Sequence, residues 1–530
     1  MSDTGTFDDL NADHLDHLDD RGDLDDSVQW LDEPMTAQER AETMVDRDVS
    51  AELSQVMEGL RMSRFDDSED DSHADVSART SRSDAERYLQ LEHDILARVP
   101  EHHVQPSLER IQMAMSILGD PQRSYRSVHI TGTNGKTSTA RMISALLTQS
   151  GRKVGRYTSP HLTQMRERIC IDDEPVSIPQ FTAMVDDVAP YIDIVDRYSR
   201  DHGGVRMSFF EVLTVVALAG FADVPVDVAV IEVGMGGRWD ATNVIDAQVV
   251  VLTPIARDHE RWLGADVVDI AREKVGIISE GATVICAEQD PEVLEVIEQA
   301  CREKDAQLRL LGRDIDIVDR RVAVGGQMIS VQTLAATYSD VYVPLLGPHQ
   351  ATNAALAIAA VEAFNSGRVL DVDIVEDGMR HATSPGRLEV VRTSPSIVVD
   401  AAHNPHGAEA LRTALEDSFD YTSVVGVFSA MADKDVEAVL TAMEPVLDHL
   451  VVTALDSTRA MELDDLAEIA RDVFGEDRVD VERHLVDAID RAVERSDAMA
   501  ETAQSAGVVI FGSVVLAGAA RDLIGGHHHG

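Results

Sequence analysis

The stretch VHITGTNGKTSTARM, residues 128–142, brings together the side chains of this sequence that are best suited to chemistry. An apolar run leads into a glycine-rich turn, followed by Lys136, Thr137 and a pattern typical of a helix. Backbone N–H groups in such a turn bind an anion at the helix N-terminus. Lys136 reaches toward β- and γ-phosphates, and the Thr137 hydroxyl faces Mg²⁺. Ile130 stands where the motif GxxxxGK[ST] has its first glycine. The stretch therefore predicts a shortened nucleotide-binding loop.

Lysine is scarce in this chain, because only five of the 46 basic residues are lysines. Arginine cannot replace a compact phosphate-binding ammonium group, or a lysine that must lose its proton. A lysine inside a motif therefore indicates a chemical role. Lys136, Lys274 and Lys434 lie in such segments, whereas Lys153 and Lys304 lie in segments typical of a surface.

Two further segments place polar residues directly after apolar, strand-like runs. EVGMGGRWDATN follows VAVI, so Glu232 ends a strand before a glycine-rich turn that lets a ligand approach closely. A carboxylate there suits a hard cation, and capping of the next helix is the alternative. ARDHERWLG follows VVVLTP and sets His259 beside Asp258. Taken alone, a histidine in this position is more often structural than a metal ligand.

Two segments with a helical pattern also set a charged residue among apolar neighbours. AREKVGI sets Lys274 against apolar neighbours, with a surface lysine paired to Glu273 as the alternative. In SFFEVLT, Glu211 opens an apolar helix behind Phe209 and Phe210, whose rings suit either a ligand or core packing. Weaker polar segments of this kind are YTSPHLTQMRERI (157–169), LLGPHQATNAALA (345–357), VVDAAHNPHGAEAL (398–411) and MADKD (431–435).

The composition restricts the class of protein. The formal net charge is −49, with 95 Asp and Glu against 46 Lys and Arg. Such acidity favours a well-solvated surface and argues against binding of nucleic acid over a basic face. No run approaches the ~20 apolar residues of a membrane span, and no signal peptide is visible. The three cysteines form no ligand pattern, so we expect a cytoplasmic protein with free, mostly buried thiols.

Strand-like apolar runs alternate with helical segments from about Asp84 onward. This alternation predicts βαβ units and a mainly parallel sheet, with ligands at the carboxyl ends of the strands. A second set of such runs begins after TSPGRLE, where Pro385-Gly386 is a plausible junction. We therefore expect an α/β protein of two domains, 84–383 and 384–524. An acidic disordered extension over 1–83 precedes them, and a flexible tail over 525–530 follows.

Taken in order, these segments resemble a folylpolyglutamate synthase/dihydrofolate synthase, the folate branch of the Mur ligases. The matching motifs are GTNGKT, SPHL followed by ERI, EVGMGGRWDATN, DH with LG, EKVGI, HQ with Asn353, PGRLE, DAAHNP and DKD. SPHL followed by ERI is more typical of the folate branch than of the cell-wall branch. The chain departs from the commonest form at Thr137, at Ala401 and at Trp239. The last of these leaves the pteridine contact open.

The resemblance implies a P-loop-type ATPase domain followed by a Rossmann-like domain. It implies a ligase that adds L-glutamate to dihydropteroate, to the γ-carboxylate of folates, or to both, through an acyl phosphate. ATP and Mg²⁺ are the implied cofactors, and a monovalent cation is left open. The implied phosphate and ATP contacts are Thr133, Asn134, Gly135, Lys136, Thr137, Asn353, Arg387 and Asp400.

The resemblance also assigns the other site residues. It places Ser159, Glu232 and His259 at Mg²⁺, and His403 near the reacting carboxylate. The catalytic set is then Lys136, Lys274, His259 and His403, with Lys274 carbamylated. The implied substrate pocket consists of Ser208, Phe209, Phe210, Glu211, Trp239, Asp240 and Ala241.

Two other functions stay open from the sequence alone. One is a Mur-type amide ligase for a cell-wall or other amino-acid substrate. The other is a nucleotide-gated binding protein whose acidic N-terminus engages a partner. Under the main interpretation the partners are small molecules only, with no nucleic acid and no membrane. A monomer is the default of the family.

Overall fold

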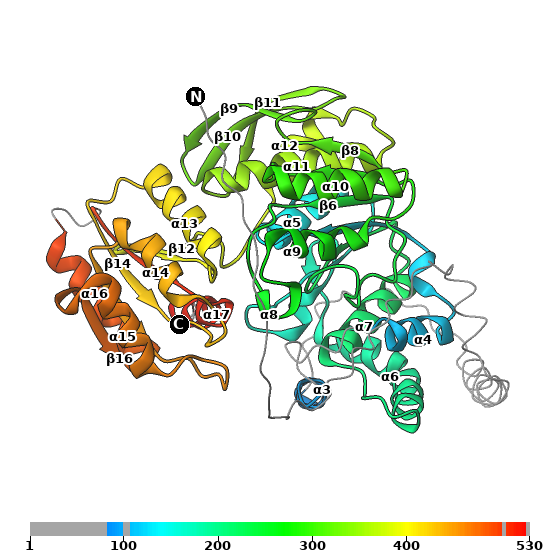
Figure 1. Cartoon of the computed structure of the whole chain (residues 1–530), viewed down its shortest axis with the longest axis horizontal. Helices are drawn as coiled ribbons and strands as arrows, with labels where there is room; N and C mark the ends of the chain where they lie inside the picture. Colours follow the sequence, from blue (N-terminus) through cyan, green and yellow to red (C-terminus); the bar gives the residue numbers. More distant parts are fainter. Residues whose placement is uncertain (1–81, 99–106, 501–504, 526–530) are drawn as a thin grey trace, which may run out of the picture. The chain divides into compact units, whose positions relative to one another are not determined.

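The computed structural model describes residues 82–98, 107–500 and 505–525 (Figure 1). All of these belong to one compact unit, Val76–Gly530. Of the predicted extension over 1–83, only Arg82 and Ser83 are described, and they begin helix α3 (Arg82–Leu96). Of the predicted tail, only Gly525 is described, as the last residue of α17 (Val514–Gly525). The rest of both segments lies outside the described residues.

The first sheet has eight strands in the order β4-β3-β2-β5-β1-β6-β7-β8. Strands β2, β5, β1, β6, β7 and β8 run parallel, and β3 and β4 pair antiparallel at one edge. The bounds are β1 Arg126–Thr131, β2 Val154–Tyr157, β3 Ile169–Ile171, β4 Glu174–Pro175, β5 Val228–Glu232, β6 Val249–Leu252, β7 Thr283–Cys286 and β8 Gln307–Leu310. The central strands are buried on both faces, which explains their continuous apolar runs.

Helices cover both faces of this sheet. On one face, α5 (Lys136–Gln149) packs against α11 (Pro348–Phe364) and α12 (Val372–Arg380). The alanine-rich helix α11 is buried almost all round, as expected for a helix without a polar face. The other face carries a second core, formed with α3, α4 (Glu109–Ile117), α6 (Ile178–Asp201) and α7 (Phe209–Asp223).

Shorter elements complete this half of the fold. Beyond β6 come α8 (Glu260–Leu263), α9 (Val267–Lys274), the short turn η3 (Val275–Ile277) and α10 (Pro291–Glu303). A three-stranded antiparallel sheet, in the order β11-β10-β9, packs next to α11 and α12. Its strands are β9 Asp316–Ala323, β10 Gly326–Gln332 and β11 Thr337–Val343.

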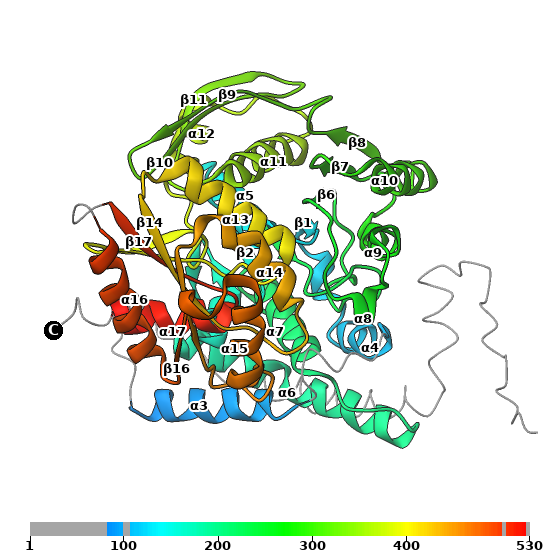
Figure 2. The same ribbon diagram turned by 60° about the vertical axis from the view of Figure 1, so that its left-hand side comes forward.

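The second large sheet has six strands in the order β12-β13-β17-β14-β15-β16, all parallel except β12. Its strands are β12 Glu389–Thr393, β13 Ser396–Val399, β14 Ser423–Phe428, β15 His449–Thr453, β16 Val479–Glu482 and β17 Ala506–Phe511. One face packs against α13 (Pro405–Ser418), α14 (Val436–Met443) and α15 (Leu463–Phe474). The other packs against α16 (Leu485–Met499) and α17, and Figure 2 shows α16 and α14 on opposite sides of β14.

The predicted fold class is confirmed, since the protein is α/β with two sheet-containing domains whose sheets are mainly parallel. No helix in the described part of the chain is long and apolar enough to cross a membrane. Cys170, Cys286 and Cys301 are buried and free, as predicted.

Candidate active site

A cavity of about 650 Å³ opens at the carboxyl ends of β1 and β5 and extends to the residues that follow β13. Ligands bind at this edge of parallel sheets. Every residue that the sequence analysis assigned to a site lines this cavity. Segments that lie far apart along the chain are therefore brought together, although their individual roles remain predictions.

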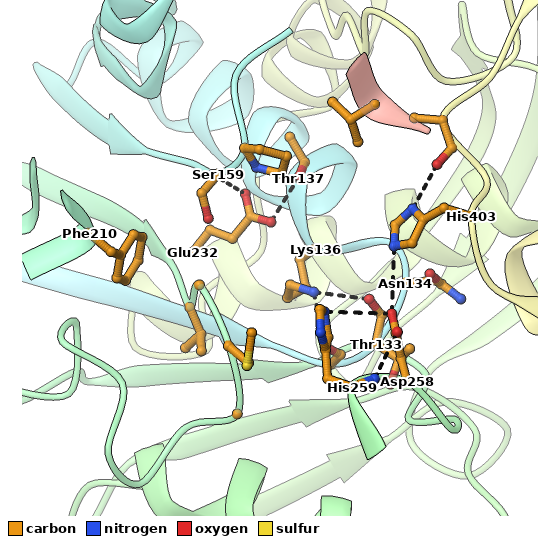
Figure 3. Close-up of a pocket in the computed structure, with 18 of the residues that line it drawn as sticks. Thr133, Asn134, Lys136, Thr137, Ser159, Phe210, Glu232, Asp258, His259 and His403 are labelled. Atoms are coloured by element: carbon orange, nitrogen blue, oxygen red, sulfur yellow. Dashed lines mark hydrogen bonds and ion pairs between the residues drawn. The ribbon is translucent and has the colours of Figure 1, made fainter. Parts of the chain in front are cut away.

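The predicted phosphate loop connects β1 to α5. Gly132 has φ +144° and Gly135 has φ +89°, conformations that favour glycine. A Cβ at Gly132 would overlap Thr253, and one at Gly135 would lie 2.6 Å from Asn353 Oδ1. Lys136 Nζ donates to the carbonyls of Gly132 (3.1 Å) and Thr133 (2.9 Å), as Figure 3 shows in part. The ammonium group is thus folded back over the loop.

Glu232 ends β5 and is buried beside this loop. Its carboxylate accepts hydrogen bonds from the Thr137 hydroxyl (2.9 Å) and from the Ser159 backbone N–H (3.2 Å). Burial raises the pKa of Glu232, and the charge of Lys136 acts against that rise. A carboxylate beside a hydroxyl oxygen fits a hard cation such as Mg²⁺.

His259, the third predicted metal ligand, faces the carboxylate of Asp258. Its Nε2 lies 3.8 Å from Asp258 Oδ2, and Figure 3 shows Lys136 between His259 and Glu232. Burial lowers the pKa of His259 to about 3. The described residues contain no group of three or more His, Cys, Asp or Glu side chains arranged to hold a metal ion. The structure thus brings Ser159 and Glu232 together and leaves His259 apart from them.

Lys274 is the last residue of α9 and is only 4% exposed. Its Nζ donates to the Gly132 carbonyl at 2.8 Å, so the side chain contacts the phosphate loop. Burial lowers the pKa of Lys274 to about 7, and the positive charge of Lys136 adds to this. The alternative of a surface lysine paired with Glu273 is wrong, because Lys274 is buried and its Nζ donates to the Gly132 carbonyl.

Asp258 connects the two large sheets, a role that the sequence analysis missed. Its Oδ1 accepts from Lys434 Nζ (2.7 Å), and its Oδ2 accepts from Asn404 Nδ2 (3.0 Å) and lies 3.6 Å from His403 Nε2. Burial acts to raise the pKa of this carboxyl, but His403, His259 and Lys434 outweigh it and hold the pKa well below its usual range. The scarcity of lysine indicated a role for Lys434, whereas the sequence analysis named Asp258 only as the neighbour of His259.

Asn134 of the phosphate loop and Asn404 form a reciprocal amide pair. Each Nδ2 donates to the other Oδ1 at 3.1 Å, and Asn134 Nδ2 also lies 2.8 Å from His406 Nδ1. The motif DAAHNP indicated a turn there, but nothing in the sequence showed that its Asn404 meets the phosphate loop. The predicted phosphate loop is thereby linked to the position of the second sheet.

Three predicted nucleotide contacts lie on the remaining wall. Asn353 Nδ2 donates to Gln350 Oε1 at 3.0 Å. Asp400 accepts from the backbone N–H groups of Leu388 and Ala402, each at 2.7 Å. Burial raises the pKa of Asp400, and the charge of Arg387 opposes that rise.

The predicted substrate wall begins with the capping box of α7. The Ser208 N–H donates to Glu211 at 2.7 Å, and Glu211 also receives the guanidinium of Arg110 at 3.0 Å. Phe210 stacks on Tyr157 with ring centroids 5.8 Å apart. Phe209 is buried, so core packing accounts for most of its surface. Arg110, which the sequence analysis missed, lies 101 residues from Glu211 and gave no local signal.

Two family profiles match the chain. Residues 205–361 match the Mur ligase middle domain, and residues 386–514 match the Mur ligase, glutamate ligase domain. The fold and the cavity therefore define a Mur-type ligase.

Individual relatives narrow this class. The chain is 49% identical over 456 residues to a dihydrofolate synthase/folylpolyglutamate synthase of Mycobacterium tuberculosis, covering 82% of this chain and 94% of the relative. It is 34% identical over 384 residues to the enzyme of that name from Bacillus subtilis, covering 71% and 88%. The chain belongs to the dihydrofolate synthase/folylpolyglutamate synthase family.

Solved structures agree with this assignment. Mycobacterium tuberculosis folylpolyglutamate synthase complexed with ADP and AMPPCP is 48% identical, with a TM-score of 0.79, covering 83% of this chain and 99% of that one. Escherichia coli FolC in complex with DHPP and ADP is 28% identical, with a TM-score of 0.71, covering 83% and 98%.

Proposed function

We propose that this protein is an ATP-dependent ligase that joins L-glutamate to dihydropteroate, to the γ-carboxylate of folates, or to both. The observation that carries the proposal is a single cavity that the phosphate loop, Lys274 and the aromatic wall around Phe210 all line. Relatives solved with ADP, with AMPPCP and with DHPP support nucleotide and folate-type ligands for this cavity. The motif SPHL followed by ERI makes the cell-wall alternative weaker.

The reaction proceeds in two balanced steps. An oxygen of the substrate carboxylate attacks the γ-phosphorus of ATP, and the bond between this phosphorus and the β,γ-bridging oxygen breaks. ADP departs, and the substrate becomes an acyl phosphate. The glutamate amine then attacks the acyl carbon, loses a proton to solvent and expels inorganic phosphate. Catalysis of this kind rests on positioning and on neutralisation of charge. Lys136 supplies that charge at the phosphates once a nucleotide draws its Nζ away from the loop carbonyls.

The cofactor assignments are proposals of the same kind. Ser159, Glu232 and His259 are the proposed Mg²⁺ ligands, with the Thr137 hydroxyl facing the ion, which would neutralise charge on the phosphates when bound. His259 would join only after turning away from Asp258. A monovalent cation is a further candidate cofactor, for which we name no ligand residues.

ATP would be contacted by Asn353 of the first proposed domain and by Arg387 and Asp400 of the second. Closure between the two sheets would therefore accompany catalysis. His403 would lie near the reacting carboxylate, and we assign it no proton transfer.

Lys274 is proposed to carry a carbamate. Its neutral amine would attack CO₂, forming an N–C bond and releasing one proton, so that a cation becomes an anion. Burial favours this step because it lowers the pKa of Lys274 to about 7. Contact with the Gly132 carbonyl places the modified group against the phosphate loop. Arginine could not react in this way, because it keeps its proton.

The remaining assignments concern the whole molecule. We propose a division into domains at 84–383 and 384–524, a monomeric state, and a cytoplasmic location. Three buried, free thiols support the location.

Glutamate-dependent phosphate release tests the function directly. The purified full chain is incubated with ATP, Mg²⁺ and L-glutamate, with dihydropteroate in one arm and tetrahydrofolate in the other. We expect phosphate release and a glutamylated product in at least one arm. Turnover only with a cell-wall precursor would establish the alternative ligase. Nucleotide binding without turnover on any acceptor would establish a nucleotide-gated binding protein.

A further inference from the structure

His129 is a buried polar residue that the proposed reaction does not use. It lies in β1, three residues before Gly132, and is fully buried. Its Nε2 lies 2.9 Å from Thr242 Oγ1, whereas Nδ1 has no hydrogen-bond partner within the described part of the chain. Burial lowers the pKa of His129 to about 3, so its ring is neutral at neutral pH and carries one N–H.

The hydrogen bonds around Thr242 fix where that proton resides. Asp240 Oδ1 accepts from both the Thr242 hydroxyl (2.5 Å) and the Thr242 backbone N–H (2.9 Å). A hydroxyl has one proton to donate, and the Thr242 hydroxyl gives it to Asp240. The Thr242 oxygen therefore accepts from His129, which places the ring proton on Nε2. The donors then run in one direction, from His129 through Thr242 to Asp240.

Asp240 uses its carboxylate mainly to hold its own loop. Besides the two bonds from Thr242, its Oδ2 accepts from the Met235 N–H at 2.8 Å. A carboxylate has about four acceptor positions, so at most one is left for a ligand. The loop 233–243 is thus folded around Asp240, and its residues Trp239 and Ala241 line the cavity.

Strand β1 holds this loop at a second point. The Thr131 hydroxyl donates to the Gly236 carbonyl at 2.9 Å. Side chains two residues apart on a strand share a face, so His129 and Thr131 both reach the loop from one face of β1. The strand that leads into the phosphate loop therefore also positions the loop 233–243.

We propose that His129 is a positioning residue for substrate binding: its Nε2–H, relayed by the Thr242 hydroxyl, holds Asp240 and thereby sets the wall formed by Trp239 and Ala241. The inference rests on the proposed function, because it assigns that wall to the dihydropteroate or folate substrate. His129 itself touches no reacting atom. Its loss would therefore affect substrate affinity before turnover.

Three variants test the relay by steady-state kinetics. His129→Leu removes the donor, Thr242→Val removes the hydroxyl at constant shape, and His129→Gln keeps an N–H near the position of Nε2. We expect the first two to raise KM for the pteridine-bearing substrate roughly 10-fold, with KM for ATP and kcat changed less than about threefold. His129→Gln should restore most of the affinity. The double variant His129→Leu/Thr242→Val should be no worse than either single variant, because both break one relay.

Val128→Ala is the matched control, since Val128 neighbours His129 in β1, is fully buried, and faces the opposite core. This variant shows how a general loss of packing in β1 changes each kinetic constant. The comparison is made at a similar decrease in Tm. Equal increases in all KM values for His129→Leu, matching those of Val128→Ala, would show a merely structural role. An additive double variant would likewise overturn the relay.

A second measurement does not depend on activity. Nitrogen NMR of the full chain labelled with ¹⁵N-histidine, with the His129 signals identified by their loss in His129→Gln, reports the tautomer. Burial raises the pKa of Asp240 to about 6, so the test is made where this carboxyl is ionised, and we expect a neutral ring protonated at Nε2 that does not titrate between about pH 7 and pH 8. A proton on Nδ1, or titration in that range, overturns the inference whatever the enzyme does. If the wild-type protein instead turns over no folate-type substrate while the tautomer is as expected, the proposed function has failed and the relay has not.

Discussion

The two glycine-rich loops after β1 and β5 differ in how they are held. Within the phosphate loop, Gly132 and Gly135 take positive φ and Lys136 donates to carbonyls three and four residues back, while Lys274 and Asn404 contact the loop from outside. The loop 233–243 is held by its own Asp240 and also, from outside, by the side chains of His129 and Thr131 in β1. It is also held by α9, whose Glu273 carbonyl accepts from the Arg238 N–H at 3.0 Å.

The difference fits the roles that we propose for the two loops. A phosphate site needs backbone N–H groups free to face the ligand; in the phosphate loop the Thr133 N–H already donates to the Pro254 carbonyl at 2.9 Å, and Lys136 and Lys274 bind loop carbonyls. A substrate wall needs a fixed shape and few free polar groups. Backbone N–H groups of the second loop accordingly donate to the carboxylates of Asp240 and Glu273. The first loop should therefore be sensitive to loss of charge, and the second to loss of shape.

The largest effect is expected for the charge of the phosphate loop. Lys136→Ala removes the ammonium group that we propose meets the phosphates, and we expect turnover to fall ~10²–10³-fold or more with the fold intact. Phosphate release and circular dichroism are the measurements. Lys153→Ala, at an exposed lysine, is the control. Near-normal ligation by a folded Lys136→Ala protein would refute the nucleotide-loop assignment.

The next largest effect concerns Lys274, which lies between the two loops. We expect Lys274→Arg to lose ~10²-fold in kcat/KM, and Lys274→Ala to regain part of its activity in acetate, which supplies the missing carboxylate. Because the pKa of Lys274 is lowered to about 7, the neutral amine that reacts with CO₂ predominates above that pH. Activity should therefore rise as pH increases through about 7, and more steeply in CO₂-limited buffer. Wild-type rates in Lys274→Arg, or an unmodified amine in a nucleotide-bound crystal structure, would contradict the carbamate.

A smaller effect is expected for the shape of the second loop. A Cβ at Gly237 would lie 2.7 Å from the Lys274 carbonyl and 2.8 Å from the Glu273 carbonyl. Gly237→Ala should push the loop from α9 and raise KM for the folate-type substrate ~10-fold, with KM for ATP little changed. Gly525→Ala, where an added Cβ meets nothing within 4 Å, is the control. A larger increase in KM for ATP than for the folate-type substrate would contradict the separation of the two loops.

The smallest effect is expected from shortening the chain. Residues 1–81 carry no dense apolar pattern, and every predicted site residue lies beyond them. A protein that begins at Arg82 should keep kcat/KM within ~10-fold of the full chain. A greater loss would mean that this segment acts on one of the loops, and separate KM values for ATP and folate would show on which.

The residues chosen from the sequence all line the cavity because the patterns that marked them are local. GTNGKT, the strand-ending Glu232 and the apolar helix that Glu211 opens each depend on a few neighbouring residues. Asp258, Asn404 and His129 could not be predicted in this way. Their partners lie 146, 270 and 113 residues away along the chain. Such pairs arise from packing of the two sheets and of β1 against β5, which no short pattern records.

The distribution of the five lysines has a practical consequence for labelling. Lys274 is buried, and Lys136 and Lys434 are largely covered within the cavity, whereas Lys153 and Lys304 are exposed. Mild amine-reactive reagents should therefore attach at those two side chains and the N-terminus, both side chains being away from the cavity. Fluorophores or surface tethers introduced in this way would leave the site intact. Labelling at Lys434 would in turn report the opening of the contact with Asp258.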